Sequence, residues 1–129
     1  MSALLSQINN SIAAKKSLLS IEKEINKSIK IIAKSIKSGG KIMLCGNGGS
    51  AADAQHLAAE FLIRLRPHVN RKPIPAITLA TDISSLTACG NDYSFEEIFS
   101  RSLEALGSKK DVLIVITTSG NSQNILNAL

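Results

Sequence analysis

Isoleucine and leucine recur every three or four positions along the first 38 residues, which is the spacing of one face of an α-helix. Ile21, Ile25, Ile29 and Ile36 belong to this series, and Gly39-Gly40 ends it. We therefore expect one long helix, or two, with a single apolar stripe. A chain of 129 residues has little other surface to cover this stripe, so we expect a second subunit to cover it and the protein to be an oligomer.

After residue 40 the pattern changes to short apolar runs, each followed by a polar loop and a helical segment. The expected strands are 41–45, 76–80 and 112–116, and the expected helices are 51–65, 82–88, 95–106 and one that begins near residue 122. A turn is expected at Gly90-Asn91-Asp92. Alternating strands and helices predict an α/β fold, a three-layer parallel sheet with helices on both faces. We divide the chain into an N-terminal helical segment for oligomerisation, 1–38, and an α/β domain, 39–129.

Composition and charge exclude several classes of protein. The net charge of +5 is concentrated in residues 1–41, which hold eight Lys and two Glu. These lysines alternate with isoleucine at helical spacing, which is typical of a solvated helix face and not of a nucleic-acid-binding arm. No apolar stretch approaches the roughly 20 residues of a membrane helix, and no signal peptide is evident. Two cysteines, Cys45 and Cys89, are too few for a disulfide framework. We expect a cytoplasmic protein without nucleic-acid or membrane partners.

The first expected strand runs into a glycine-rich loop, Gly46-Asn47-Gly48-Gly49-Ser50, directly before a helix. Helix N-termini bind anions, and ligands bind at the carboxyl ends of parallel strands. The glycines also match the dinucleotide fingerprint, which needs an acid about 20 residues later, but Asp82 lies 36 positions after Gly46. A P-loop is excluded because no Lys-Ser/Thr pair follows the glycines. A tight turn without any ligand stays open as an alternative.

The third expected strand runs into a hydroxyl-rich loop, Thr117-Thr118-Ser119-Gly120-Asn121-Ser122. Hydroxyl and backbone N–H groups together can surround a phosphate without any Lys or Arg. The alternative is that these residues merely cap the next helix. One cap uses one hydroxyl and the loop has four, so we expect Thr117, Thr118, Ser119 and Ser122 to bind a phosphate.

His56 and Glu60 lie four residues apart on the helix after the glycine-rich loop, which puts both side chains on one face. A histidine with a carboxylate can bind a divalent metal or transfer a proton. The alternative is a surface ion pair. A catalytic zinc normally takes three protein ligands, and the sequence offers no obvious third; His68, beside Pro67, is interpreted as a loop residue.

These motifs together resemble the SIS (sugar isomerase) domain family, and within it the phosphoheptose isomerase branch. The resemblance extends over essentially the whole chain and implies the flavodoxin-like SIS fold. It is carried by residues 45–56 (CGNGGSAADAQH), Ala59-Glu60, Gly90-Asn91-Asp92, Phe99-Ser100-Arg101 and Thr118-Ser119-Gly120-Asn121-Ser122.

The resemblance implies an aldose–ketose isomerase that interconverts sedoheptulose 7-phosphate and D-glycero-D-manno-heptose 7-phosphate for bacterial heptose and lipopolysaccharide synthesis. It implies zinc held by His56 and Glu60, proton transfer by Glu60, and a homotetramer with active sites between subunits. Remote phosphate binding would hold the sugar in register. The substrate-binding residues that it implies are Asn47, Gly48, Gly49, Ser50, Glu60, Asn91, Asp92, Thr117, Thr118, Ser119 and Ser122.

The family's other zinc ligands, a Gln and a His, lie on a C-terminal helix, and this chain ends before it. We therefore expect a C-terminally truncated, partial SIS domain, and we expect the isolated 129 residues to be inactive. Two alternatives stay open. One is a non-catalytic SIS-domain protein that binds a partner, like the relative that associates with the bacterial replication initiator, and the other is an inactive remnant. Glu60 favours the enzyme, since a pure binding protein does not need this carboxylate.

Overall fold

A computed structural model describes residues 2–129, which form two units, one up to Ala33 and one from Lys34 to Leu129. The first unit contains helix α1 (Ala3–Ser17), a 3₁₀ turn over Leu18–Ile21 and most of helix α2 (Glu22–Lys37). The Ser2 hydroxyl accepts a hydrogen bond from the Leu5 amide at the start of α1, as a serine N-cap does. Of the two arrangements that the periodicity left open, two helices is the correct one.

The apolar stripe of the first unit is exposed. Ile8, Ile12, Ile21, Ile25 and Ile29 each keep between 39 and 56% of their surface accessible. An apolar face of this extent on a folded helix pair is typical of an interaction surface. No helix within residues 2–129 combines the length and the apolar character that a membrane span requires.

The second unit is built on a parallel sheet of three strands in the order β2-β1-β3. The strands are β1 (Ile42–Gly46), β2 (Ala76–Thr78) and β3 (Val112–Ile116). The central strand β1 is buried along its whole length, as its continuous apolar sequence predicts. Gly46 pairs with Ile116, so the loops after β1 and β3 leave the sheet side by side.

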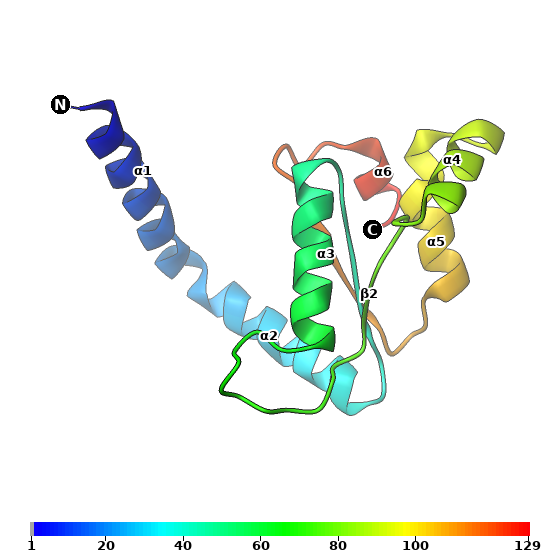
Figure 1. Ribbon diagram of the computed structural model, residues 1–129, viewed down its shortest axis with the longest axis horizontal. Helices are drawn as coiled ribbons and strands as arrows, with labels where there is room; N and C mark the ends of the chain where they lie inside the picture. Colours follow the sequence, from blue (N-terminus) through cyan, green and yellow to red (C-terminus); the bar gives the residue numbers. More distant parts are fainter. Residues whose placement is uncertain (1) are drawn as a thin grey trace. The chain divides into compact units, whose positions relative to one another are not determined.

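Helices cover both faces of this sheet, which confirms the predicted three-layer α/β fold (Figure 1). Helix α3 (Gly49–Leu62) packs against one face through Ala54 and Ala58. On the other face, α4 (Ile83–Asp92), α5 (Ile98–Leu106) and α6 (Gln123–Leu126) pack around Met43 and Cys45 of β1. The helices that follow β1 and β3 thus lie on opposite faces.

The expected turn at Gly90-Asn91-Asp92 is wrong, because these residues form the last turn of α4. The prediction gave too much weight to the turn-forming residue types Gly, Asn and Asp. In the structure the helix continues through them, and the Tyr93 amide donates to the Cys89 carbonyl at its end. Three boundaries also differ. Helix α3 ends at Leu62 and not at residue 65, β2 ends at Thr78 and not at residue 80, and residues 95–97 form a 3₁₀ turn before α5.

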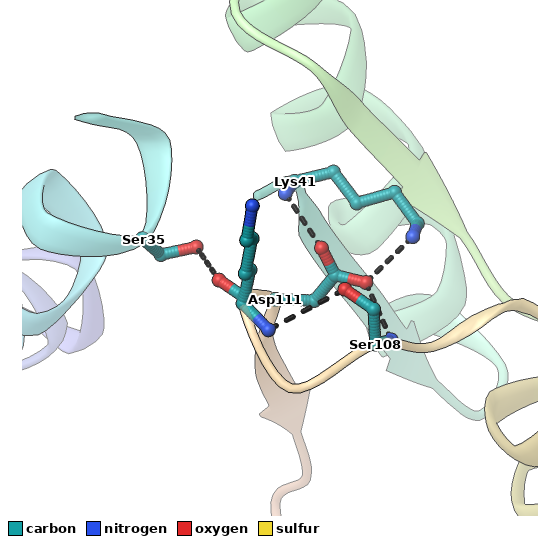
Figure 2. A network of polar contacts seen from close by, with 5 residues as sticks. Ser35, Lys41, Ser108 and Asp111 are labelled. Atoms are coloured by element: carbon teal, nitrogen blue, oxygen red, sulfur yellow. Dashed lines mark hydrogen bonds and ion pairs between the residues drawn. The ribbon is translucent and has the colours of Figure 1, made fainter. Parts of the chain in front are cut away.

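A buried carboxylate ties the start of β1 to the start of β3 (Figure 2). Asp111 accepts hydrogen bonds from the Lys41 amide at 2.8 Å, the Lys41 ammonium at 2.6 Å and the Ser108 amide at 2.8 Å. Beside it, the Ser35 hydroxyl of α2 donates to the Lys110 carbonyl at 2.6 Å. Burial raises the pKa of the Asp111 carboxyl, but the bonds from Lys41 and Ser108 outweigh burial and hold this pKa well below its usual value.

Candidate functional site

The glycine-rich loop after β1 turns directly into α3 because it has glycine at two positions where a side chain would not fit or would strain the backbone, Gly46 and Gly48. A Cβ on Gly46 would lie 2.7 Å from the Ser50 carbonyl oxygen, so the backbone approaches too closely for any other residue. Gly48, at the N-cap of α3, has a φ of 57°, a conformation that glycine adopts most readily. Gly48 and Gly49 are exposed, and the first backbone N–H groups of a helix have no partner within it.

A cavity of about 220 Å³ lies beside this loop, between the carboxyl ends of β1 and β2. Its polar lining includes Asn47, Gln55 and Thr78, and Phe95 and Leu86 close its apolar side. Ala80, which also lines it, has a φ of 53°, a strained value for a residue with a side chain. No residue of the hydroxyl-rich loop lines this cavity, so the cavity belongs to the β1–β2 side of the site.

The hydroxyl-rich loop after β3 holds its four hydroxyls in a short turn. The Thr117 hydroxyl oxygen accepts from the Gly120 amide at 3.1 Å, and the Ser119 hydroxyl oxygen accepts from the Asn121 amide at 3.2 Å. Ser122 is the N-cap of α6, but its hydroxyl makes no capping hydrogen bond. Capping therefore does not account for this loop, and its hydroxyl protons remain available to an acceptor.

A pair of asparagines joins the glycine-rich loop to the first turn of α6, which directly follows the hydroxyl-rich loop. The Asn47 amide nitrogen donates to the Asn124 side-chain oxygen at 2.8 Å, and the Asn124 amide nitrogen donates to the Asn47 side-chain oxygen at 2.8 Å. Asn124 is only 3% exposed. Sequence reasoning missed Asn124, and the only signal for it was a polar residue at a core-facing position of a short helix, next to Ile125.

His56 and Glu60 do meet on the outer face of α3. The His56 Nε2 atom lies 3.5 Å from Glu60 Oε1, and the two side chains are 72% and 25% exposed. The second carboxylate oxygen, Glu60 Oε2, is buried and has no hydrogen-bond partner in the described part of the chain. Buried carboxylate oxygens without a partner are rare, so this atom is available to a ligand. No group of three or more His, Cys, Asp and Glu side chains within residues 2–129 could hold a metal ion.

The end of α3 is held by an arginine. Arg71 donates from its guanidinium to the carbonyl oxygens of Glu60 and Phe61, at 2.5 and 2.9 Å. A cation at a helix C-terminus satisfies carbonyl groups that have no partner in the helix and complements the helix dipole. This clamp folds the loop 63–75 back onto α3, where Leu65, Arg71 and Ile74 line a groove together with His56 and Glu60.

Asn91 and Asp92 lie apart from these groups in the last turn of α4. Their side chains are exposed, and Asn91 donates to the Asp92 carboxylate at 2.8 Å. Within residues 2–129, no hydrogen bond connects them to either loop. The structure therefore brings together the two loops and, separately, His56 with Glu60, but it does not bring Asn91 and Asp92 to them.

Cys45, at the end of β1, is not a candidate nucleophile. Its side chain is 1% exposed, and burial raises the pKa of its thiol to about 11. A thiol with such a pKa stays protonated near neutral pH, and the thiolate is the reactive form. Cys45 is therefore a packing residue of the core.

Comparison with known proteins gives this site a context. The sequence of residues 7–129 matches the family model described as SIS domain. The chain is 53% identical over 116 residues to a protein of Helicobacter pylori (strain P12) named phosphoheptose isomerase, and this match covers 90% of the chain and 59% of the relative. It is 64% identical over 95 residues to the phosphoheptose isomerase of Paramagnetospirillum magneticum, covering 74% of the chain and 48% of the relative. The chain thus spans about half to three-fifths of the length of these relatives.

Two solved structures share the fold. The structure of phosphoheptose isomerase GmhA from Neisseria gonorrhoeae superposes with a TM-score of 0.85 at 42% identity, covering 97% of this chain and 64% of that one. The structure of a phosphoheptose isomerase from Francisella tularensis gives a TM-score of 0.78 at 38% identity, with coverages of 98% and 68%. Both agree with the predicted three-layer architecture.

Proposed function

Because the chain belongs to the SIS domain family, we propose that it binds a sugar phosphate and forms the substrate-binding part of a phosphoheptose isomerase. The reaction would interconvert sedoheptulose 7-phosphate and D-glycero-D-manno-heptose 7-phosphate, for bacterial heptose and lipopolysaccharide synthesis. The observation that carries the proposal is the hydroxyl-rich loop, whose hydroxyl protons are free to donate, at the edge of the sheet where the glycine-rich loop also ends. The names of the relatives, at 53 and 64% identity, support the choice of reaction.

The phosphate is assigned to the hydroxyl-rich loop. The hydroxyl oxygens of Thr117 and Ser119 already accept hydrogen bonds from the loop's own amides. Their O–H groups can therefore donate to an acceptor outside the loop. Thr118 and Ser122 add two more hydroxyls. Phosphate oxygens accept such hydrogen bonds well because the acceptor is charged. The exposed Gly48 and Gly49 and the Ser50 hydroxyl would then contact the sugar.

We assign the proton transfer to Glu60. Aldose–ketose isomerisation moves a proton between two adjacent carbons, so it needs a base close to both. A carboxylate is a common base for this purpose, and Glu60 has one buried oxygen without a hydrogen-bond partner in the described residues. His56, 3.5 Å from the other oxygen, orients the carboxylate. Binding the distant phosphate keeps the reacting carbons in register with this base.

His56 and Glu60 also fit part of a zinc site, because His56 Nε2 and Glu60 Oε1, 3.5 Å apart, are an imidazole nitrogen and a carboxylate oxygen, the donor types that zinc takes. These two residues would hold the ion, and residues 2–129 supply no third His, Cys, Asp or Glu beside them. Bound zinc would polarise the substrate's carbonyl oxygen. A complete site needs further ligands, which the resemblance to the family would place on a C-terminal helix.

We further propose that the protein is a homotetramer and acts in the cytoplasm. The exposed isoleucines of α1 and α2 support self-association, since a stripe of this length is rare on a monomer. Both cysteines are unpaired, which is usual for proteins of a reducing compartment.

The proposal is tested with the full-length protein as its gene encodes it. Sedoheptulose 7-phosphate is added, and formation of the aldose is followed in wild type, Glu60→Gln and a control, Glu104→Gln, whose carboxylate is exposed on α5. We expect Glu60→Gln to lower kcat by roughly 10²–10⁴, the usual contribution of a general base, and the control to leave kcat unchanged.

Three results would contradict the proposal in different ways. Sugar phosphate binding by wild type without turnover would favour a non-catalytic binding protein. Turnover that Glu60→Gln leaves intact would remove the catalytic role of Glu60. The absence of both binding and turnover would favour an inactive remnant.

A further inference from the structure

The two polar loops flank the point where the chain switches faces of the sheet. Strands β1 and β3 are neighbours, and the helices that follow them, α3 and α6, pack on opposite faces. Ligands of open parallel sheets bind in the crevice at such a point. A ligand in this crevice touches the loop after β1 and the loop after β3 together, so the separation of these two loops decides how well it fits.

Backbone pairing fixes this separation only where the loops leave the sheet. Gly46 and Ile116 are register partners, and paired strands lie about 4.8 Å apart. Beyond them the six residues 117–122 leave the sheet as a loop whose middle, 118–121, is exposed, and no backbone hydrogen bond joins the two loops within residues 2–129. Without another tie, the distance between the loops would vary.

The asparagine pair is that tie. Asn47 belongs to the loop after β1, and Asn124 belongs to the first turn of α6, directly after the loop that follows β3. Their two hydrogen bonds, both 2.8 Å, form a closed amide–amide ring. Asn124 is 3% exposed, and a buried amide strongly favours keeping its partner because an unpaired one costs free energy.

We propose that Asn124 is a positioning residue for the reaction proposed above: it acts through Asn47 and sets the distance between the sugar-binding loop and the phosphate-binding loop. This inference rests on the proposed function. The positioning role predicts different behaviour for two kinds of ligand. A sugar phosphate contacts both loops and depends on their separation, whereas inorganic phosphate contacts only the hydroxyl-rich loop and does not.

The test compares these two ligands in the full-length protein. The variants are Asn124→Ala and a control at the end of the same helix, Asn127→Ala, which removes hydrogen bonds with Gln123, Glu96 and Glu97 but none to the glycine-rich loop. For Asn124→Ala we expect KM for sedoheptulose 7-phosphate to rise about tenfold or more, the effect of losing one to two net hydrogen bonds. We expect kcat and the inhibition constant of inorganic phosphate to change less than about threefold, within the scatter of a single weak contact. The control should leave KM unchanged.

A second variant tests the pairing chemistry itself. In Asn124→Asp the ionised carboxylate accepts from the Asn47 nitrogen but repels the Asn47 oxygen. Once protonated, the new carboxyl has one donor and one acceptor, as the amide has, and both hydrogen bonds return. Burial raises the pKa of such a carboxyl. The ratio of KM in this variant to KM in wild type should therefore decrease as the pH is lowered from about 8 to about 5, while the ratio for Asn124→Ala stays constant.

The outcomes separate this inference from the proposed function. If wild type fails to bind the sugar phosphate, the proposed function is wrong and the positioning role falls with it. If wild type binds, but Asn124→Ala weakens sugar phosphate and inorganic phosphate equally, the residue only maintains the fold. An unchanged KM in Asn124→Ala, or an Asn124→Asp ratio that does not depend on pH, equally overturns the positioning role.

Discussion

Replacing Asp111 by alanine should destabilise the second unit more than any change of an exposed acid. The Asp111 side chain is 5% exposed, and its two oxygens accept three hydrogen bonds, one of them within an ion pair to Lys41 (Figure 2). In Asp111→Ala the Lys41 ammonium can turn to solvent, but the Lys41 and Ser108 amides lose their partners. Each orphaned amide costs about 1 kcal/mol and the lost ion pair up to about 1 kcal/mol, which gives a loss of about 3 kcal/mol.

Urea unfolding followed by circular dichroism measures this loss. The control is Asp53→Ala on α3, because the Asp53 side chain is exposed and makes no hydrogen bond or ion pair within residues 2–129. We expect the control to stay within about 0.5 kcal/mol of wild type. Asp111→Asn, which keeps one acceptor and loses the charge, should lie between wild type and Asp111→Ala.

The same carboxyl makes the loss depend on pH. Its pKa in the folded protein lies below the value of about 3.9 that an unfolded chain has. Its contribution to stability is therefore complete above that unfolded value and disappears as the pH falls through the folded pKa. The difference between wild type and Asp111→Ala should be constant from about pH 8 to about pH 5 and shrink below about pH 4. A loss under about 1 kcal/mol at neutral pH, or one that grows on acidification, would refute this reasoning.

Two further predictions concern backbone strain and self-association. Ala80→Gly should raise the free energy of unfolding by about 1 kcal/mol, because Ala80 has a φ of 53°; an unchanged or lower urea midpoint would contradict this. For the proposed homotetramer, light scattering should give about four times the subunit mass, and Ile12→Glu with Ile25→Glu should lower it, since both side chains lie in the exposed stripe. The control is Lys27→Glu, which changes a lysine of α2 that is not part of the apolar stripe. A monomeric wild type would contradict the proposed role of the stripe.

Much of the fold follows from local sequence. Continuous apolar runs predicted all three strands because strands of a parallel sheet between two helix layers carry few polar residues. The predicted ends of α3 and β2 were less accurate. Such ends depend on tertiary contacts, for example the hydrogen bonds of Arg71 to the end of α3. The prediction of a turn at 90–92 failed for a similar reason, because Leu86 and Cys89 pack α4 against the core and the helix continues through residues that favour turns.

The candidate site was predictable where chemistry is local. Residues His56 and Glu60 meet because helical geometry places i and i+4 together. Asn124 could not be found this way, because its partner Asn47 lies 77 residues away and meets it only once β1 and β3 pair. A buried asparagine on a short helix has the same appearance in sequence whether its partner is a neighbour or a distant loop.

The geometry of α3 also bears on why self-association would serve catalysis. Ala54 and Ala58 face the sheet, and His56 and Glu60 follow each of them by two residues, about 200° further round the helix. This pair therefore lies on the side of α3 away from the sheet, where the loop 63–75 partly covers Glu60. Eleven residues separate Gly49 from Glu60, which is about 16 Å along the helix axis. An extended seven-carbon sugar phosphate is shorter than that. For the proposed reaction, a substrate held by the loops of one subunit would then have to meet Glu60 of a neighbouring subunit, which agrees with the proposed self-association.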